Sequence, residues 1–164
     1  MRRDTEIILD LQTLFLTVLK DLQSAAPWSR WQIVRGYPNA TILDNFSNLT
    51  IYVMAPTWFS PGIANQGAKK STNNWQITIG VWADKKTGGV EETLIATSRI
   101  MDFFGDVTKW AQTEFNVTLG STAYTDTTLI DQGINIFDVS GPQEILNNVD
   151  TNEFRNEFTI NFRS

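Results

Sequence analysis

The stretch EFRNEFTINFRS, residues 153–164, alternates large apolar side chains with polar or charged ones. Successive side chains of a β-strand point to opposite faces of the sheet, so this alternation predicts a strand with one covered face. The apolar side carries Phe154, Asn156, Phe158, Ile160 and Phe162, and the polar side carries Arg155, Glu157, Thr159, Asn161 and Arg163. We expect the Phe side to pack beneath helices in the core, and the polar side to meet solvent or a neighbouring subunit.

Other segments of the chain have the same β-type character. They lie at residues 31–35, 49–54, 75–84, 121–128 and 133–139. In the third of these, one face carries Trp75, Ile77, Ile79 and Val81. Alternation of this kind is typical of an antiparallel sheet that has one face covered.

Two segments carry apolar residues at helical spacing. The first spans roughly residues 5–24, with Asp4 as a plausible cap at its start. The second begins after Gly88 and Gly89, has Glu91 and Glu92 in its first turn and runs to about Phe104. Its apolar face is expected to extend through Val107, Trp110, Ala111 and Phe115. The order of elements predicts an α+β fold, a mainly antiparallel β-sheet with an N-terminal helix and a second central helix packed on one face.

The 164 residues fit a single domain, residues 1–164. Between two predicted strands, the stretch at about residues 56–74 is rich in Pro, Gly and small polar residues and predicts a long mobile loop. Gly141 and Pro142 predict a short helical turn over residues 143–147.

The chain contains no Cys and no His. Their absence excludes Ser-His-Asp and Cys-His catalysis and metal sites built on thiolate or imidazole. Two acidic pairs, Glu91 with Glu92 and Asp126 with Asp131, are candidate carboxylate pairs, but adjacent acids at a helix start are normally solvated partners of the helix dipole. The segment GIANQGAKKS, residues 62–71, departs from a phosphate-binding loop and leads into a strand instead of a helix. We therefore expect no enzymatic activity, no catalytic residue, no cofactor and no bound metal.

The net charge of −5 at pH 7 argues against a general phosphate-binding surface, because non-specific nucleic-acid affinity rests on Lys and Arg. The first residues, MRRDTEIILDLQTLFLTVLKDLQ, are apolar but repeatedly interrupted by charges. They predict neither a signal peptide nor a membrane span, so we expect a protein that is made and used in a cytoplasm.

Candidates for contacts with a neighbouring subunit or ring are Trp58, Phe59, Lys69, Lys70, Arg155, Glu157 and Arg163. The aromatic pair lies in the predicted loop, where exposed aromatic side chains often mark protein contacts. The two Lys residues of the same loop are suited to docking on an acidic surface. The three charged residues of the last strand can meet complementary charges on a neighbour. We expect reversal of Arg155 and Glu157 to disturb assembly while leaving the fold intact.

The sequence GINIFDVSGPQEILNNVDTNEFRNEFTINFRS, residues 133–164, resembles tail terminator proteins of tailed bacteriophages, also called neck terminator or tail completion proteins. In that group a strand ending near Gly-Pro leads to a short apolar turn, a charged linker and a final strand of alternating aromatic residues. The matching parts are residues 133–139, Gly141 with Pro142, Ile145 with Leu146, and residues 153–163. The N-terminal helix, the long loop and the helix after VWADKKTGG are similar in order, so the resemblance covers most of the chain.

This resemblance implies a structural virion protein that forms a ring, typically of six copies, where the neck meets the end of the tail tube. The ring would end tube polymerisation and join the tail to the head. Its partners would be further copies of itself, the tail tube protein and the head-tail connector or neck proteins, with no membrane involved. DNA would pass through the lumen without specific binding, and assembly would take place in the host bacterial cytoplasm.

Two alternatives stay open. One is another phage ring protein, such as a head-tail connector or tail tube subunit. The other is a module that binds sugar or single-stranded nucleic acid through some of the six Trp residues. The number of subunits, the station in the neck or tail, the tail type and the host also stay open.

Overall fold

The strands β4 (Asn74–Asp84) and β8 (Glu153–Arg163) lie side by side at the centre of the main sheet. They pair antiparallel along their whole length, from Asn74 opposite Arg163 to Asp84 opposite Glu153. The structure is a computed structural model that describes residues 4–24, 31–37, 49–59, 74–84, 89–144 and 153–163. The predicted last strand is therefore confirmed, and it is an interior strand of the sheet.

The main sheet extends outward from this central pair. On the edge that faces away from β4, β8 pairs with β7 (Asn135–Glu144). On the edge that faces away from β8, β4 pairs with two short strands, β2 (Thr50–Val53) and β3 (Thr57–Phe59). Beyond β2 lies β1 (Gln32–Arg35), which pairs with it in parallel. The other pairings in the described sheet are antiparallel, so the predicted mainly antiparallel sheet is confirmed.

One face of this sheet forms the core. In β4 the buried apolar residues are Trp75, Ile77, Ile79 and Val81, and in β8 they are Phe158, Ile160 and Phe162. Between them along β8 lie half-buried polar side chains, as strand alternation requires. The prediction that the Phe side of the last strand faces the core is confirmed, because all three of these β8 side chains are almost fully buried.

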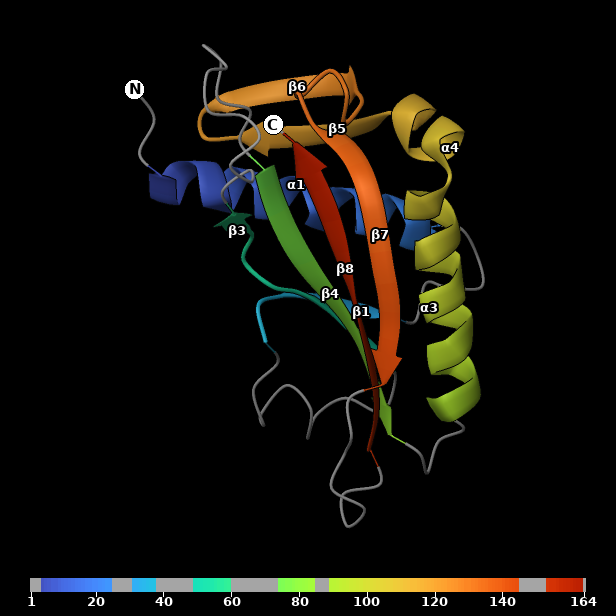
Figure 1. Cartoon of the computed structure of the whole chain (residues 1–164). Helices are drawn as coiled ribbons and strands as arrows, with labels where there is room; N and C mark the ends of the chain where they lie inside the picture. Colours follow the sequence, from blue (N-terminus) through green and yellow to red (C-terminus); the bar gives the residue numbers. More distant parts are fainter. Residues whose placement is uncertain are drawn as a thin grey trace.

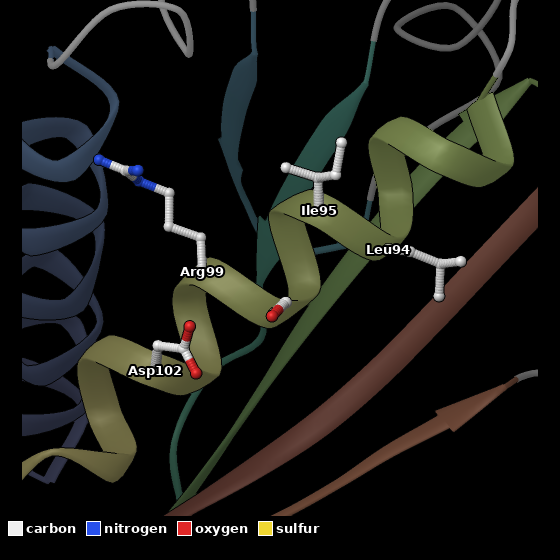
Figure 2. A pocket seen from close by; sticks show the side chains of 5 residues that line it. Leu94, Ile95, Arg99 and Asp102 are labelled. Atoms are coloured by element: carbon white, nitrogen blue, oxygen red, sulfur yellow. The ribbon is translucent and has the colours of Figure 1, made fainter.

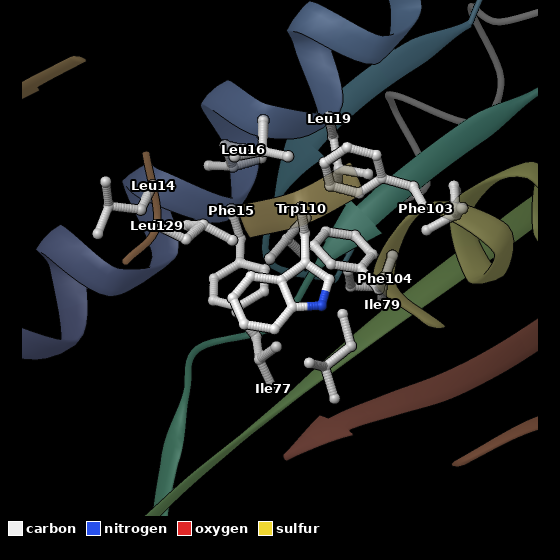
Figure 3. Close-up of a cluster of buried hydrophobic side chains, with 14 of the residues drawn as sticks. Leu14, Phe15, Leu16, Leu19, Ile77, Ile79, Phe103, Phe104, Trp110 and Leu129 are labelled. Atoms are coloured by element: carbon white, nitrogen blue, oxygen red, sulfur yellow. The ribbon is translucent and has the colours of Figure 1, made fainter. Parts of the chain in front are cut away.

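Two helices cover the core face, α1 (Asp4–Ser24) and α3 (Gly89–Gly105). Phe15 of α1 lies where the two helices meet the sheet, and Figure 3 shows it beside Phe104 of α3. The ring centroid of Phe15 is 5.6 Å from that of Phe104 and 5.2 Å from that of Phe162 in β8. In Figure 1, α1 crosses behind the long strands and α3 stands beside β7. The predicted N-terminal and central helices are thus confirmed, together with the α+β class.

A buried amide ties α1 to the sheet. The side chain of Gln12 donates a hydrogen bond of 2.7 Å to the carbonyl of Val53 and accepts one of 2.8 Å from the Arg35 guanidinium. Because both ends of the amide are paired, its burial carries no unsatisfied polar group. The hydrogen bonds fix the position of α1 relative to β1 and β2.

The helical face was expected to extend as far as Phe115, and this expectation was wrong. A separate short helix, α4 (Val107–Gln112), follows α3, and Asp106 caps it by accepting hydrogen bonds from the backbone nitrogens of Thr108 and Lys109 at 2.9 and 3.4 Å. Phe115 then begins β5 (Phe115–Leu119), which forms a two-stranded ribbon with β6 (Thr122–Thr127). The period of the buried residues changes from helical to alternating at this point, and β5 has the burial pattern of a strand with one covered face.

The helical turn expected after Gly141 and Pro142 is also not formed where the structure describes the chain. Strand β7 continues through both residues to Glu144, and they bulge opposite Phe158, between the pairs Ser140 with Thr159 and Gln143 with Glu157. Gly141 has φ of 108°, and a Cβ atom there would lie 3.0 Å from the Cβ of Phe158. The bond between the two residues is cis. A bulge therefore accommodates the Gly-Pro pair within the strand, and residues 145–147 of the expected turn lie outside the described residues.

The loop expected at residues 56–74 is shorter than predicted. Residues Thr57–Phe59 form β3, which pairs with the start of β4, and Asn74 is already the first residue of β4. Thr, Trp and Phe all favour strands, and pairing with β4 outweighs the effect of the neighbouring Pro residues. The remainder, residues 60–73, lies outside the described residues.

Candidate interaction surface

The face of the main sheet that points away from α1 and α3 is called here the open sheet face. From β8 it receives Arg155, Glu157, Thr159, Asn161 and Arg163, and from β4 it receives Gln76, Thr78, Gly80 and Trp82. Tyr52 of β2 belongs to it, because Tyr52 lies directly opposite Gly80. The open sheet face contains all three charged residues of β8 that the sequence singled out.

Glu157 is held by a buried tyrosine. The Tyr52 side chain is 0% exposed, and its ring occupies the space above Gly80, where a Cβ atom would overlap it. The Tyr52 hydroxyl donates a hydrogen bond to Oε1 of Glu157. Burial raises the pKa of Tyr52 well above its ordinary value of 10.0, and the hydrogen bond and negative charge of Glu157 raise it further. Glu157 therefore satisfies a buried donor within its own subunit.

Arg155 is held by aromatic rings. Its guanidinium carbon lies 5.2 Å from the ring centroid of Trp82 and 5.4 Å from that of Tyr37, distances typical of cation–π contacts. The guanidinium also donates a hydrogen bond to the Tyr37 hydroxyl. The Tyr37 ring in turn contacts both Tyr52 and Trp82, with centroids 5.4 and 5.7 Å apart. Arg155 and Glu157 are therefore parts of one aromatic cluster, and both side chains are half-buried.

Arg163 lies at the opposite end of β8. About 26 Å of extended strand separates it from Arg155. Its guanidinium lies 5.0 Å from the ring of Phe137, which is 48% exposed. Beside them Asn161 donates a hydrogen bond of 3.1 Å to Asp138 of β7. Arg163 is exposed, so it is the most accessible of the three charged candidates on β8.

Trp58 lies on the other side of the sheet. It is directly opposite Trp75, a residue of the core face, and directly opposed residues share a face. Because β3 is at the margin of the sheet, the Trp58 side chain is 56% exposed. Phe59 is the last residue of β3, opposite Asn74, and Lys69 and Lys70 lie outside the described residues. The candidates therefore do not form one patch, since Trp58 and the β8 charges lie on different faces.

The outer side of α3 is a surface that the sequence reasoning missed. Leu94 is 52% exposed there, and it borders two shallow hollows of about 430 and 350 Å³ that also share Ser98 and Asp102. Figure 2 shows Leu94, Ile95 and Asp102 on this side of the helix, with Arg99 reaching toward α1. The residues one and two helical turns after Leu94 are Ser98 and Asp102, which are both polar. This spacing is the sequence signal that separates Leu94 from the buried residues of the same helix.

The described residues contain no group of three or more acidic side chains that could hold a metal ion. Across the described part of the chain, each helix falls short of the length or the hydropathy that a membrane-spanning segment requires. A search against models of known protein families finds no match for this chain. A search against curated proteins likewise finds no significant match.

Proposed function

We propose that this protein is a structural virion protein of the tail terminator, or neck terminator, type. Six copies form a ring that caps the tail tube, ends its polymerisation and joins the tail to the head-tail connector. The observation that carries the proposal is the arrangement of the C-terminal half: β7 passes through Gly141 and Pro142, and the chain returns as the central strand β8. This arrangement agrees with the resemblance of residues 133–164, except that Gly-Pro lies within a strand instead of starting a turn.

The layout of the sheet supports a role in contacts between proteins. Both core helices lie on one face of the sheet, and the polar and charged side chains of β8 lie on the other face, where Arg163 is exposed. Arg155 and Glu157 are fixed by contacts within their own subunit, which lowers the entropy cost of presenting them to a partner. Among the candidates whose side chains the structure describes, Trp58 and Arg163 are exposed, and they lie on different faces of the sheet.

The charge of the chain suits a ring that conducts DNA. A net charge of −5 repels phosphate groups, whereas a lumen that bound DNA would gain affinity through counterion release. Passage without retention is the behaviour that the proposed ring requires.

Deletion of the gene in the phage that encodes this chain tests the proposal. Because the ring ends tube polymerisation and joins tail to head, its loss should give heads without tails and tubes of irregular, excessive length. Expression of the chain in trans should restore joined particles with tubes of normal length. Joined particles with tubes of normal length in the absence of the chain would contradict the proposal. If tubes end normally but heads stay unattached, the result favours another ring of the neck, such as a head-tail connector.

The exposure of Trp58 favours a second candidate, a module that binds sugars or single-stranded nucleic acid by stacking. Trp75, Trp82 and Trp110 are buried, so a ligand that stacks on the surface would act mainly on Trp58 among these four. Titration with oligosaccharides and with single-stranded oligonucleotides separates the two candidates. Saturable fluorescence quenching that is lost in Trp58→Phe would support the module, and unchanged fluorescence would favour the ring protein.

A further inference from the structure

Two exposed charges of opposite sign lie on different sides of the described structure. Arg163 of β8 is on the open sheet face, where its guanidinium carbon lies 5.0 Å from the ring centroid of Phe137. Asp102 is exposed on the outer side of α3, a helix that covers the opposite, core face of the sheet. Within the described residues neither of these two charges forms an ion pair. Both charges can therefore pair with a charge on another molecule.

The outer side of α3 combines apolar side chains with negative charge. Leu94 and Ile95 are exposed there, and they border the hollow of about 430 Å³ that Asp102 also lines. Arg99 lines the same hollow, but Figure 2 shows its side chain reaching toward α1. A partner that complements this surface presents the reverse combination, an apolar side chain beside an accessible cation.

Arg163 and Phe137 present that combination on the open sheet face. The Phe137 ring is 48% exposed, and the guanidinium that lies against it is exposed as well. Arg and aromatic side chains are enriched in protein interfaces. The nearby acid Asp138 lies opposite Asn161, whose amide donates a hydrogen bond of 3.1 Å to it. Asp138 is thus bound within its own subunit, whereas the charge of Arg163 is not paired.

The other cations of the described residues are less suitable for this contact. Arg35 donates hydrogen bonds to α1 through both of its terminal nitrogens. Lys109 lies 4.0 Å from the carboxylate that caps α4, and Arg155 is half-buried among aromatic rings. Lys20 is exposed, but the residue that follows it in α1 is an exposed acid. Arg163 is therefore the described cation that best complements the surface of α3.

We propose that Arg163 and Phe137 of one copy of this chain dock on the outer side of α3 in the next copy. Arg163 pairs with Asp102 of that copy, and Phe137 packs against Leu94 at the hollow. The charges are complementary, and each surface also supplies an exposed apolar side chain to the contact. Both surfaces belong to the same chain, so a second copy provides the partner that each of them requires.

The contact joins two different surfaces, so it is a head-to-tail contact. Each copy donates its open sheet face to one neighbour and its α3 surface to the other neighbour. Contacts of this type close into a ring or continue as a filament, depending on the rotation between copies. The inference rests on the proposed ring and names the surfaces that meet in it. A stable interface buries roughly 1,200–2,000 Å², so this pair of surfaces anchors a larger contact.

Exchange of the two charges tests the pairing in a phage that lacks the gene and receives the chain in trans. Arg163→Asp and Asp102→Arg each place like charges together, and each should lower the yield of joined particles at least about tenfold. The double variant restores opposite charges and should return the yield to within about threefold of the unaltered chain. Lys20→Glu reverses an exposed charge outside the contact and should leave the yield unchanged. Thermal melts establish that each variant is folded.

Cross-linking tests the contact on the purified chain. Because the chain contains no Cys, thiols placed at Ser98 and Asn135 are the only thiols present. Ser98 lies one helical turn before Asp102, and Asn135 lies opposite Arg163, so neither change removes a proposed contact residue. A concentrated mixture of Ser98→Cys and Asn135→Cys chains is treated with a short bis-maleimide. The mixed dimer should form at least about tenfold faster than either variant forms its own dimer, because like surfaces do not meet in a head-to-tail contact.

A mixture of Ser98→Cys with Lys20→Cys is the control for random collision. Mixed dimers of Ser98→Cys and Asn135→Cys that form no faster than in this control would overturn the proposed contact. A folded double charge variant that fails to restore the yield, while the unaltered chain is present in the particles, would also overturn it and would leave the ring intact. If particles lack the chain or join without it, the proposed ring fails, and the cross-linking result alone decides the contact.

Discussion

Glu157 is both a surface charge and the acceptor for a buried hydroxyl. The hydrogen bond from Tyr52 and the stacking of Arg155 on Trp82 connect β2, β4 and β8 on the open sheet face. These contacts change one expectation from the sequence. Reversing Arg155 and Glu157 would leave the Tyr52 hydroxyl facing a cation, so the reversal should lower stability as well as disturb assembly.

Truncation of Glu157 measures this effect. In Glu157→Ala the Tyr52 hydroxyl loses its partner while it stays buried, which costs about 1–3 kcal/mol of unfolding free energy. Thr159→Ala, on the same face of β8, is the matched control, and we expect it to cost less than about 1 kcal/mol. Urea denaturation of both variants gives the comparison. Equal losses would show that the hydrogen bond contributes nothing particular.

Gly80 is required by the position of the Tyr52 ring. In Gly80→Ala the added methyl group overlaps that ring, and we expect a loss of at least about 1–3 kcal/mol from overpacking. Gly105→Ala is the control, because no atom lies within 4 Å of a Cβ at that position. It should be neutral, or stabilising by up to about 1 kcal/mol, since Ala favours helix more than Gly does. Thermal melts that rank the two variants equally would contradict this packing.

The raised pKa of Tyr52 predicts how stability depends on pH. The folded state keeps the Tyr52 hydroxyl protonated, so its full contribution to the free energy of unfolding is present below pH 10.0, the ordinary pKa. Above that pH the hydroxyl ionises in the unfolded chain but stays protonated in the folded chain, so the free energy of unfolding falls as pH rises. Tyr52→Phe lacks this group and should show a smaller loss of stability between pH 10 and 11 than the unaltered chain. Parallel pH profiles for the two proteins would contradict the assignment.

At the scale of elements, Asp106 divides what the sequence presents as one apolar face. Asp106 has an extended backbone conformation, which ends α3, and its carboxylate caps the start of the separate helix α4 before β5 begins. Asp106→Ala should destabilise the protein by about 0.5–2 kcal/mol, as is usual for loss of a side-chain cap. Asp106→Asn retains an accepting oxygen and should recover most of this loss. A denaturation series with both variants checks the cap, and equal losses in the two would contradict it.

Some elements could be predicted from the sequence and others depend on distant pairing. The alternation in β4 and β8 identified both strands, because each has one face in the core and one outside it. Strand β3 was missed because its three residues are too few to carry a periodic signal and gain their structure by pairing with β4. The bulge at Gly141 was missed for a related reason. The bulge forms because β7 pairs with β8 in a register that places Gly141 opposite Phe158, and a local reading of the sequence does not give that register.

The candidate contact residues were predictable as exposed or polar, but their grouping was not. Alternation placed Arg155, Glu157 and Arg163 on one face, as the structure has them. It gave no sign that two of these would be engaged by Tyr52, Tyr37 and Trp82. Those partners come from other strands, and their positions depend on sheet order.

At the scale of the whole molecule, the exposed candidates should affect assembly more than stability. Trp58→Ala and Arg163→Glu each alter an accessible side chain, so we expect both to reduce ring formation at least about tenfold if each contributes to a contact between subunits. Val107→Ala, an exposed apolar residue of α4 outside the candidate set, serves as the control. Ring yield is measured by native mass spectrometry, alongside thermal melts for each variant. Normal ring yield in both candidate variants would remove these residues from the interface.

Electron microscopy of the phage neck tests the central claim most directly. The proposed hexamer has a mass of about 112 kDa, six times the 18.6 kDa of the chain. Averaged images should show a ring with sixfold symmetry at the head-proximal end of the tail tube, with density that fits the described sheet and helices of six copies. The chain should also be present in purified virions at six copies per particle. Virions that lack this chain, or that hold it at a site away from the junction of neck and tail, would contradict the account.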